Sequence, residues 1–312
     1  MTTPVRPRVT VVEVGPRDGF QMEATFIPTA LKVEVIDAVT ESGVSKIEAT
    51  SFVSPKAIPQ MRDAAEVMAR IRRRPGVVYS ALVPNLRGAH AAIDAGVDVV
   101  RLVVCATETY NLRNVGMSVE ASLQALEAIV RMASDANRPT EVAIALAFGC
   151  PLEGEVPESR VVALAQRIAS LGVGLIAIAD SVGFANPIQV TSVFTRLHAV
   201  LPAVTWTVHL HDTRGMGLAN ALAAHNAGIA EFDAAIGGLG GCPVVPGATG
   251  NIASEDVAHM FEEIGVDTGV DLDTLMRASR MMQSFLGRPL PSRVLKAGTR
   301  AAAWRQAHGA TA

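Results

Sequence analysis

The stretch "VTVVEVGPRDGFQ", residues 9–21, decides between two ways of folding this chain. It opens with an apolar, β-branched run of the kind found in strands that are buried on both faces. In a doubly wound open sheet, the first strand is normally followed by a glycine-rich phosphate-binding turn. The turn here, "GPRDGFQ", does not match that pattern and carries Arg17 and Asp18 instead. The choice between the two folds therefore depends on how often this strand pattern returns in the rest of the chain.

Similar runs return seven more times along the chain. Several contain hardly any polar residue, as expected of parallel strands that are covered on both faces. Segments such as 29–43, 119–136 and 160–172 lie between them and place apolar residues at helical spacing. Strands that alternate eight times with helices predict an α/β fold, a closed (β/α)8 TIM barrel. The eight candidate strands are residues 9–15, 46–52, 77–84, 99–106, 141–148, 174–180, 205–211 and 231–238.

The length of 312 residues suits a single barrel domain. After the eighth candidate strand, two more helical patterns cover residues 252–265 and 272–286, and a short helical tail follows. We therefore expect one catalytic (β/α)8 domain over residues 1–312. Its barrel would span about 9–265, and a C-terminal helical extension would span about 270–312.

Composition narrows both the class of function and the compartment. The formal net charge is −3 and the pI is about 6.2, whereas proteins that bind nucleic acid are usually basic, so no nucleic-acid partner is expected. Three widely spaced cysteines fit neither a disulfide framework nor a structural zinc cluster and indicate a reducing compartment. The first residues have no apolar signal core, and no window of about 18 apolar residues is free of charge. A cytoplasmic protein without membrane contact is the expectation.

Polar residues collect at the predicted carboxyl ends of the strands, where barrels of this type place their active sites. A closed barrel would gather them around one mouth from distant parts of the chain. His209 and His211 lie two residues apart in a strand and so point to the same face, while Leu210 points to the opposite one. The residues at these ends are Arg17, Asp18, Glu48, Thr50, Ser51, Asp180, His209, His211, Asp212, Cys242 and Asn251.

The histidine pair is the strongest local signal for a metal. Two imidazoles on one face near a strand end form half of a metal site. Two polar residues satisfied by ordinary hydrogen bonds are the alternative, which loses weight once a carboxylate converges on the same mouth. Asp18 is the natural third ligand, and these three would suit Zn, Fe(II) or Mn. If Asn251 adds an amide oxygen and water completes the shell, the site favours Mg2+ or Mn2+.

A glycine-rich loop, "GGLGGCPVVPGATGN" at 237–251, follows the last candidate strand. Glycines alone would indicate a flexible surface loop. Long loops on this barrel face usually carry function, however, and glycine hinges around one reactive side chain indicate a lid that closes over substrate. Cys242 would then donate or accept a proton. The lid glycines are Gly240, Gly241 and Gly247.

Arg17 follows a buried strand, where a guanidinium without a partner is costly. Glu48 or Asp180 could pair with it. Such a pair could be purely structural, or the cation could stabilise an enolate or carboxylate oxygen. Both could hold at once, since the carboxylate could orient the arginine.

These residues belong to five short motifs, "VEVGPRDGFQ" (12–21), "IEATSFVSPK" (47–56), "GCPLEG" (149–154), "HLHDT" (209–213) and "GGLGGCP…GATGN" (237–251). Together the motifs resemble the 3-hydroxy-3-methylglutaryl-CoA lyases, in the wider family of metal-dependent lyases and acyl transferases on (β/α)8 barrels. The similarity runs from about residue 9 to residue 270. The glycine–cysteine loop is the most specific motif, because the condensing synthases of the wider family generally lack it.

The resemblance implies a divalent-metal-dependent carbon–carbon lyase. Its substrate would be 3-hydroxy-3-methylglutaryl-CoA or a related 3-hydroxy-3-alkylglutaryl-CoA, so an acyl-CoA is the implied partner. Its products would be acetyl-CoA and acetoacetate, or a homologous 3-oxo acid. Such an enzyme would serve leucine catabolism or ketone body metabolism.

Carried over by position, the resemblance also implies roles for eight residues. Arg17 would stabilise the enolate of the leaving acetyl-CoA, Glu48 would hold that arginine, and Cys242 would donate a proton under the lid. Asp180 resembles a carboxylate that supports catalysis. The residues that resemble ligands of Mg2+ or Mn2+ are Asp18, His209, His211 and Asn251.

The chain departs from the usual lyase pattern at the fifth candidate strand. The lyases usually read Arg-Gly-Tyr-Val-Ser there, whereas this chain has Glu141 at the arginine, Ala143 at the tyrosine and Ala145 at the serine. A pocket lined by these alanines would be wider and less polar. After the histidines, "TRGMG" with Arg214 also replaces the usual Thr-Tyr-Gly-Gln, so we expect a bulkier substituent at carbon 3 to be accepted. The expected substrate-binding residues are Gln21, Ser51, Ala143, Ala145 and Arg214.

Three other functions compete with the lyase. A condensing acyl-CoA synthase acting on a 2-oxo acid would use the same barrel and metal, but such chains are usually longer. A two-histidine, one-carboxylate Fe(II) oxygenase fits the ligands, but it usually has a different, all-β fold. A barrel that only binds a partner would not need a complete ligand set. Barrels of this kind often form dimers, so a homodimer or higher homo-oligomer is a further expectation, although no segment marks an interface.

Overall fold

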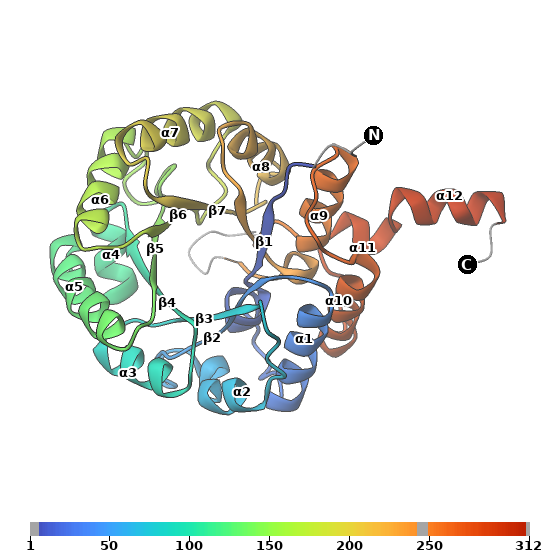
Figure 1. Cartoon of the computed structure of the whole chain (residues 1–312), viewed down its shortest axis with the longest axis horizontal. Coiled ribbons are helices and arrows are strands. Elements are labelled where there is room, and N and C mark those ends of the chain that lie inside the picture. The colour runs from blue at the N-terminus through green and yellow to red at the C-terminus, as the bar shows by residue number, and fades with distance from the viewer. Residues whose placement is uncertain (1–5, 242–248, 310–312) are drawn as a thin grey trace.

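The computed structural model describes residues 6–241 and 249–309, and its centre is a closed barrel of eight parallel strands (Figure 1). Each strand pairs with its neighbours in the chain, and the last pairs with the first, so the sheet has no open edge. The predicted (β/α)8 fold is confirmed. The strands are β1 (Thr10–Glu13), β2 (Lys46–Ser51), β3 (Val78–Leu82), β4 (Val99–Cys105), β5 (Thr140–Ala145), β6 (Leu175–Asp180), β7 (Thr205–Leu210) and β8 (Glu231–Ala234).

Several strands end earlier than their apolar runs predicted. β1 stops at Glu13, because the next residues form the single π-helical turn η1 (Gly15–Gly19) at the barrel mouth. β8 likewise leads into the short helical turn η3 (Ile236–Gly238). β5 stops at Ala145, since Leu146 has a positive φ of 59°, which an extended strand does not allow. The runs exceed the strands because these mouth turns are buried as well.

A ring of helices surrounds the barrel (Figure 1). The helices predicted at 29–43, 119–136 and 160–172 are confirmed to within two residues at each end. Ser118 caps α5 by accepting a hydrogen bond from a backbone N–H of the first turn. The elements are α1 (Thr29–Glu41), η2 (Pro59–Met61), α2 (Ala64–Arg70), α3 (Leu86–Asp94), α4 (Glu108–Val115), α5 (Val119–Asp135), α6 (Glu158–Ser170), α7 (Pro187–Val200), α8 (Gly217–Asn226), α9 (Ser254–Glu263), α10 (Leu272–Leu286), α11 (Arg293–Ala297) and α12 (Arg300–His308).

The C-terminal helices form the predicted extension. Helix α10 packs along α1 and against η3, beside the seam where the first and last strands meet. Helix α12 projects away from the barrel in Figure 1, and none of its residues is buried. The extension therefore begins as part of the helical ring and ends as an arm.

The alternation of side chains in β7 separates the core from the mouth. Leu210 is fully buried and packs in the main apolar core, whereas His209 and His211 line the cavity described below. This is the arrangement that the two-residue period predicted. Among the described residues, no helix combines the length and apolar character needed to cross a membrane.

Glu13, at the end of β1, fixes the position of turn η1. Its buried carboxylate accepts hydrogen bonds from the N–H groups of Gly15 (2.7 Å) and Ile236 (2.9 Å) and from the hydroxyl of Ser254. A Cβ at position 15 would overlap this carboxylate, so glycine is required there. Burial raises the pKa of Glu13 to about 8, although the three donors oppose the shift.

This pKa predicts that the protein loses stability as the pH rises from 4.5 to about 8. In that window the folded protein keeps a proton on Glu13 that the unfolded chain has lost, so the folded state binds more protons. The contribution of Glu13 to the decrease in the free energy of unfolding would reach about 1.4 kcal/mol per pH unit. The variant Glu13→Gln is neutral at every pH and should have a flatter slope, which urea unfolding at several pH values would measure. Equal slopes for the two proteins would contradict the raised pKa.

Candidate active site

A cavity of about 1080 Å3 opens at the carboxyl ends of the strands. Its walls include apolar side chains of β3 to β5 and of the segments that follow them. Its base is a cluster of charged and imidazole side chains, which we call the polar floor. The polar floor consists of Arg17, Asp18, Glu48, Arg101, His209, His211 and Asp233.

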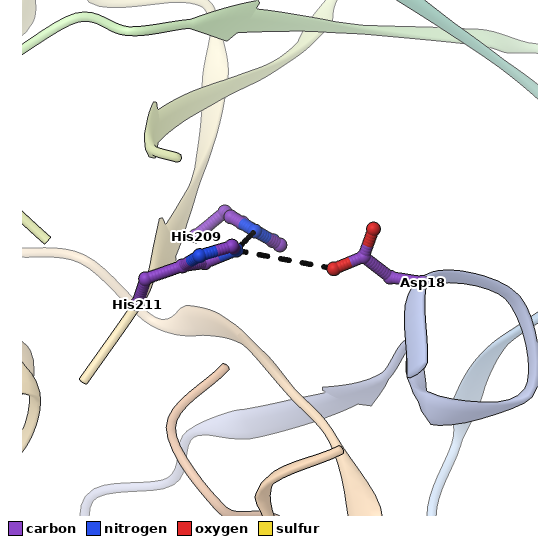
Figure 2. A group of neighbouring side chains, drawn as sticks. All are labelled: Asp18, His209 and His211. Atoms are coloured by element: carbon purple, nitrogen blue, oxygen red, sulfur yellow. Dashed lines mark hydrogen bonds and ion pairs between the residues drawn. The ribbon is translucent and has the colours of Figure 1, made fainter. Parts of the chain in front are cut away.

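Three residues of the polar floor converge as a group that could hold a metal ion (Figure 2). Asp18 comes from η1, and His209 and His211 come from the end of β7. The two Nε2 atoms lie 3.1 Å apart, and Nε2 of His211 lies 3.9 Å from Oδ2 of Asp18. One ligand atom from each residue lies within 4.8 Å of the others, and all three residues are buried.

Buried polar atoms near this group lack partners, which fits a metal centre. Asn251 donates from Nδ2 to Oδ2 of Asp18 (2.7 Å) and to the carbonyl of Leu239 (3.0 Å). Its Oδ1 has no hydrogen-bond partner in the described part of the chain, although the atom is buried. A buried amide oxygen without a partner is costly, and a cation bound beside Asp18 would satisfy it.

The charge of the polar floor also fits a cation. Together with Glu141, which touches Arg101, the floor holds four carboxylates and two guanidiniums, a formal 2 − 4 = −2 when all are ionised and the imidazoles are neutral. A divalent cation would balance this charge. Two imidazoles, one carboxylate and one amide oxygen are also ligands that Mg2+ or Mn2+ can use.

The protonation states suit metal ligation. Burial alone would raise the pKa of Asp18, but Arg17, the two imidazoles and Asn251 hold that pKa well below its usual range. Burial and the neighbouring imidazole of His209 lower the pKa of His211 to about 3. Near neutral pH, Asp18 is therefore a carboxylate and His211 is a neutral imidazole with a lone pair to offer.

Asp233, from β8, orients the first histidine. Its Oδ2 lies 3.1 Å from Nδ1 of His209, which places the proton on Nδ1 and leaves Nε2 free to face the metal group. Sequence reasoning missed Asp233. The available signal was an acidic residue inside the otherwise apolar run "EFDAAIGG", at 231–238.

Arg17 pairs with two carboxylates of the polar floor. Its Nε lies 2.8 Å from Oε2 of Glu48, and its Nη1 lies 2.6 Å from Oδ1 of Asp18. Of the two partners considered for it, Glu48 is therefore the one in contact. Asp180 instead accepts hydrogen bonds from the N–H groups of Phe184 and Ala185, in the turn after β6.

Arg101, from β4, is a buried cation that sequence reasoning missed. Its guanidinium lies 2.8 Å from Asp233, 2.9 Å from Glu141 and 3.3 Å from Glu48. These carboxylates come from β8, β5 and β2, so the side chain reaches across the barrel interior. The signal in the sequence was one arginine inside the run "VVRLVVCA" at 99–106.

The structure divides the expected substrate-binding residues into two groups. Gln21, Ala143 and Ala145 line the cavity, and Gln21 donates to Oδ1 of Asp18. Ser51 and Arg214 are not among the described residues that line it, and neither is Asp180. Ser51 donates to the carbonyl of Leu82, and Arg214 donates to two carbonyls after β6 and lies over the ring of Phe184. Burial raises the pKa of Asp180, although the N–H groups that bind it oppose the shift.

The glycine-rich loop is only partly described. Cys242 and Gly247, predicted as the lid cysteine and a lid glycine, lie outside the described residues. Gly241 lines the cavity. Gly240 has a φ of 130°, and a Cβ there would overlap the amide group of Asn251, so the absence of a side chain lets the loop approach that residue.

Comparisons with known proteins identify the family of the chain. A model of the HMGL-like family matches residues 8–282. The hydroxymethylglutaryl-CoA lyase YngG of Bacillus subtilis (strain 168) is 42% identical over 293 residues, which cover 94% of this chain and 98% of that protein. The mitochondrial hydroxymethylglutaryl-CoA lyase of Homo sapiens is 39% identical over 290 residues, covering 93% and 89%. The solved structure of an HMG-CoA lyase from Acinetobacter baumannii, in complex with coenzyme A and 3-methylmalate, is 42% identical and superposes with a TM-score of 0.90 over 94% of this chain and 96% of that one.

Proposed function

The chain belongs to the HMGL-like family, and we propose that it is a carbon–carbon lyase acting on 3-hydroxy-3-methylglutaryl-CoA or a related 3-hydroxy-3-alkylglutaryl-CoA. The products are acetyl-CoA and acetoacetate or a homologous 3-oxo acid. The observation that carries this proposal is the metal-ligand group of Asp18, His209 and His211 beside the half-buried cation of Arg17. The names of relatives that match over most of the chain support the same reaction.

We propose Mg2+ or Mn2+ as the resident cation. Asp18, His209, His211 and Asn251 would hold it, because they offer two imidazoles, a carboxylate and an otherwise unsatisfied amide oxygen. A divalent cation at this place supplies Lewis-acid polarisation of the substrate hydroxyl and of a carboxylate oxygen. Asp233 keeps Nε2 of His209 free for ligation.

The bond changes of the cleavage assign a role to Arg17. The hydroxyl at carbon 3 passes its proton to water and becomes a ketone, while the bond between carbons 2 and 3 breaks. The electron pair moves onto the thioester, which becomes an enolate, and protonation of its carbon gives acetyl-CoA. Arg17 is a half-buried cation at the cavity floor and stabilises the enolate oxygen, while Glu48 holds the guanidinium in place.

The remaining roles follow the same proposal. Cys242 is the acid that protonates the enolate carbon, and the glycines around it let the loop close over the substrate. Gln21, Ala143 and Ala145 contact the substrate. Asp180, Ser51 and Arg214 act through the backbone segments that they bind.

A condensing synthase that joins an acyl-CoA to a 2-oxo acid has less support. It would use the same barrel and the same metal ligands. The relatives that cover most of this chain carry lyase names, however, and the chain covers nearly all of their length. An assay with acetyl-CoA and 2-oxo acids would separate the two functions.

The test of the lyase is release of acetyl-CoA by the purified chain with Mg2+ or Mn2+, over a series of 3-hydroxy-3-alkylglutaryl-CoA substrates. We expect turnover of the methyl substrate that depends on the cation. We also expect longer alkyl groups to be cleaved, because two small apolar side chains, Ala143 and Ala145, line the wall of the cavity. No release from any member would contradict the lyase, and release from the methyl substrate alone would contradict the wider pocket.

A further inference from the structure

Arg101 joins two parts of the polar floor that the proposed reaction uses separately. One part is the pair of Arg17 with Glu48, and the other is the pair of His209 with Asp233. Arg101 contacts the carboxylate of each pair, at 3.3 Å from Glu48 and at 2.8 Å from Asp233. Its side chain is 4% exposed, so these contacts are shielded from bulk water.

The contacts share individual oxygen atoms. Oε2 of Glu48 lies 2.8 Å from Nε of Arg17 and 3.3 Å from Nη1 of Arg101. Oδ2 of Asp233 lies 3.1 Å from Nδ1 of His209 and 2.8 Å from Nη2 of Arg101. The planar guanidinium of Arg101 therefore holds both oxygen atoms. One belongs to Glu48, which holds Arg17, and the other belongs to Asp233, which orients His209.

Glu141 keeps Arg101 in this position from a third direction. It is the direct neighbour of Arg101 in the pairing of β4 with β5, and it lies 2.9 Å from Nη2. Without the guanidinium, three buried carboxylates on three strands would face one another with no shared cation. They would then repel or take up protons, and either change would release Glu48 and Asp233 from their present positions.

We propose that Arg101 is a positioning residue for this site, which sets the geometry of the metal ligands and of Arg17 together. Its effect on turnover rests on the proposed lyase reaction, whereas its effect on metal binding needs only the metal-ligand group. Arg101 acts through Glu48 and Asp233, and its removal should lower metal affinity and turnover in parallel.

The experiment compares Arg101→Met, Arg101→Lys and a control, Lys46→Met. Lys46 also forms an ion pair between strands, at 2.6 Å from Glu231 of β8, on the far side of β1, but it lies at the start of β2, opposite the cavity end. Each metal-free protein is titrated with Mn2+ by calorimetry, its unfolding by urea is followed, and kcat and KM are determined at saturating Mn2+.

We expect Arg101→Met to bind Mn2+ up to about 10- to 100-fold more weakly, because it releases Asp233 and this is the usual loss when the partner behind a metal ligand no longer holds it. Its kcat should fall by more than its KM rises. Arg101→Lys keeps the charge but not the fork of donors, so its Mn2+ affinity should lie between those of the wild type and Arg101→Met. Lys46→Met should keep wild-type Mn2+ affinity, whatever its stability.

Wild-type Mn2+ affinity in Arg101→Met would overturn the proposal. If the same variant also unfolds at a lower urea concentration, Arg101 is a structural ion-pair partner only. If Arg101→Met does not fold, wild-type Mn2+ affinity and kcat in Arg101→Lys would overturn the proposal instead. If the wild-type protein cleaves no acyl-CoA, the lyase is contradicted. If the Arg101 variants nevertheless lose Mn2+ affinity, the positioning role is supported.

Discussion

Replacing His209 by alanine should abolish Mn2+ binding and acetyl-CoA release together. The imidazole is one of the three side chains that converge on the metal group, and its loss removes a direct ligand. We expect the affinity for Mn2+ to fall by more than about 100-fold, which exceeds the usual effect of losing a partner behind a ligand. Turnover should fall by about 1000-fold or more, because metal catalysis contributes several kcal/mol and each 1.36 kcal/mol is a factor of ten. Calorimetry and the acetyl-CoA assay measure the two losses.

Two further variants separate this result from a general loss of structure. His198→Ala removes a histidine on α7 that packs near Trp206, away from the cavity, and should keep wild-type Mn2+ affinity. Cys242→Ser should slow turnover strongly while Mn2+ affinity stays intact, since the proposed acid is not a ligand. Unchanged Mn2+ affinity in His209→Ala would remove the metal site from the proposal.

The second large effect is expected from Arg17→Met. This change removes the positive charge proposed to stabilise the enolate, so kcat should fall by about 100- to 1000-fold, as it does when one preorganised oxyanion donor is lost elsewhere. KM should change little, because the enolate charge exists only after the bond has begun to break. Steady-state kinetics at saturating Mn2+ provides the measurement.

The contact of Arg17 with Asp18 offers another explanation for a lower kcat, namely a weakened metal site. Since the two side chains lie 2.6 Å apart, the variant could also weaken the metal site. Raising the Mn2+ concentration separates the two effects. A kcat that returns to the wild-type value at high Mn2+ would show that Arg17 serves the metal site alone and would contradict its role at the enolate.

Part of the site could be predicted from the sequence because strands impose a simple geometry. The two-residue period of β7 put His209 and His211 on one face and Leu210 in the core. The parallel barrel then predicted that the residues after β1 would share the mouth with them, and Asp18 lies there. Such predictions need only the direction of the backbone and the order of the strands.

Other side chains could not be placed in this way. Asp180 is the last residue of β6, at the same end of the barrel as Asp18, yet its carboxylate binds the backbone of the turn that follows it. Ser51 and Arg214 likewise bind nearby carbonyls and are not among the described residues that line the cavity. At and beyond the last residue of a strand, a polar side chain binds whichever donors and acceptors the neighbouring strand or turn leaves open.

The sequence by itself determined the barrel, since strand and helix periods and strand order are local properties that repeat eight times. It also determined that two imidazoles would face the mouth. Only the tertiary structure decided that Arg17 pairs with Glu48, that Asp233 stands behind His209, and that one arginine from β4 links these pairs. These contacts join residues far apart in the chain, and buried charges settle on whichever partners the closed barrel brings within hydrogen-bond distance.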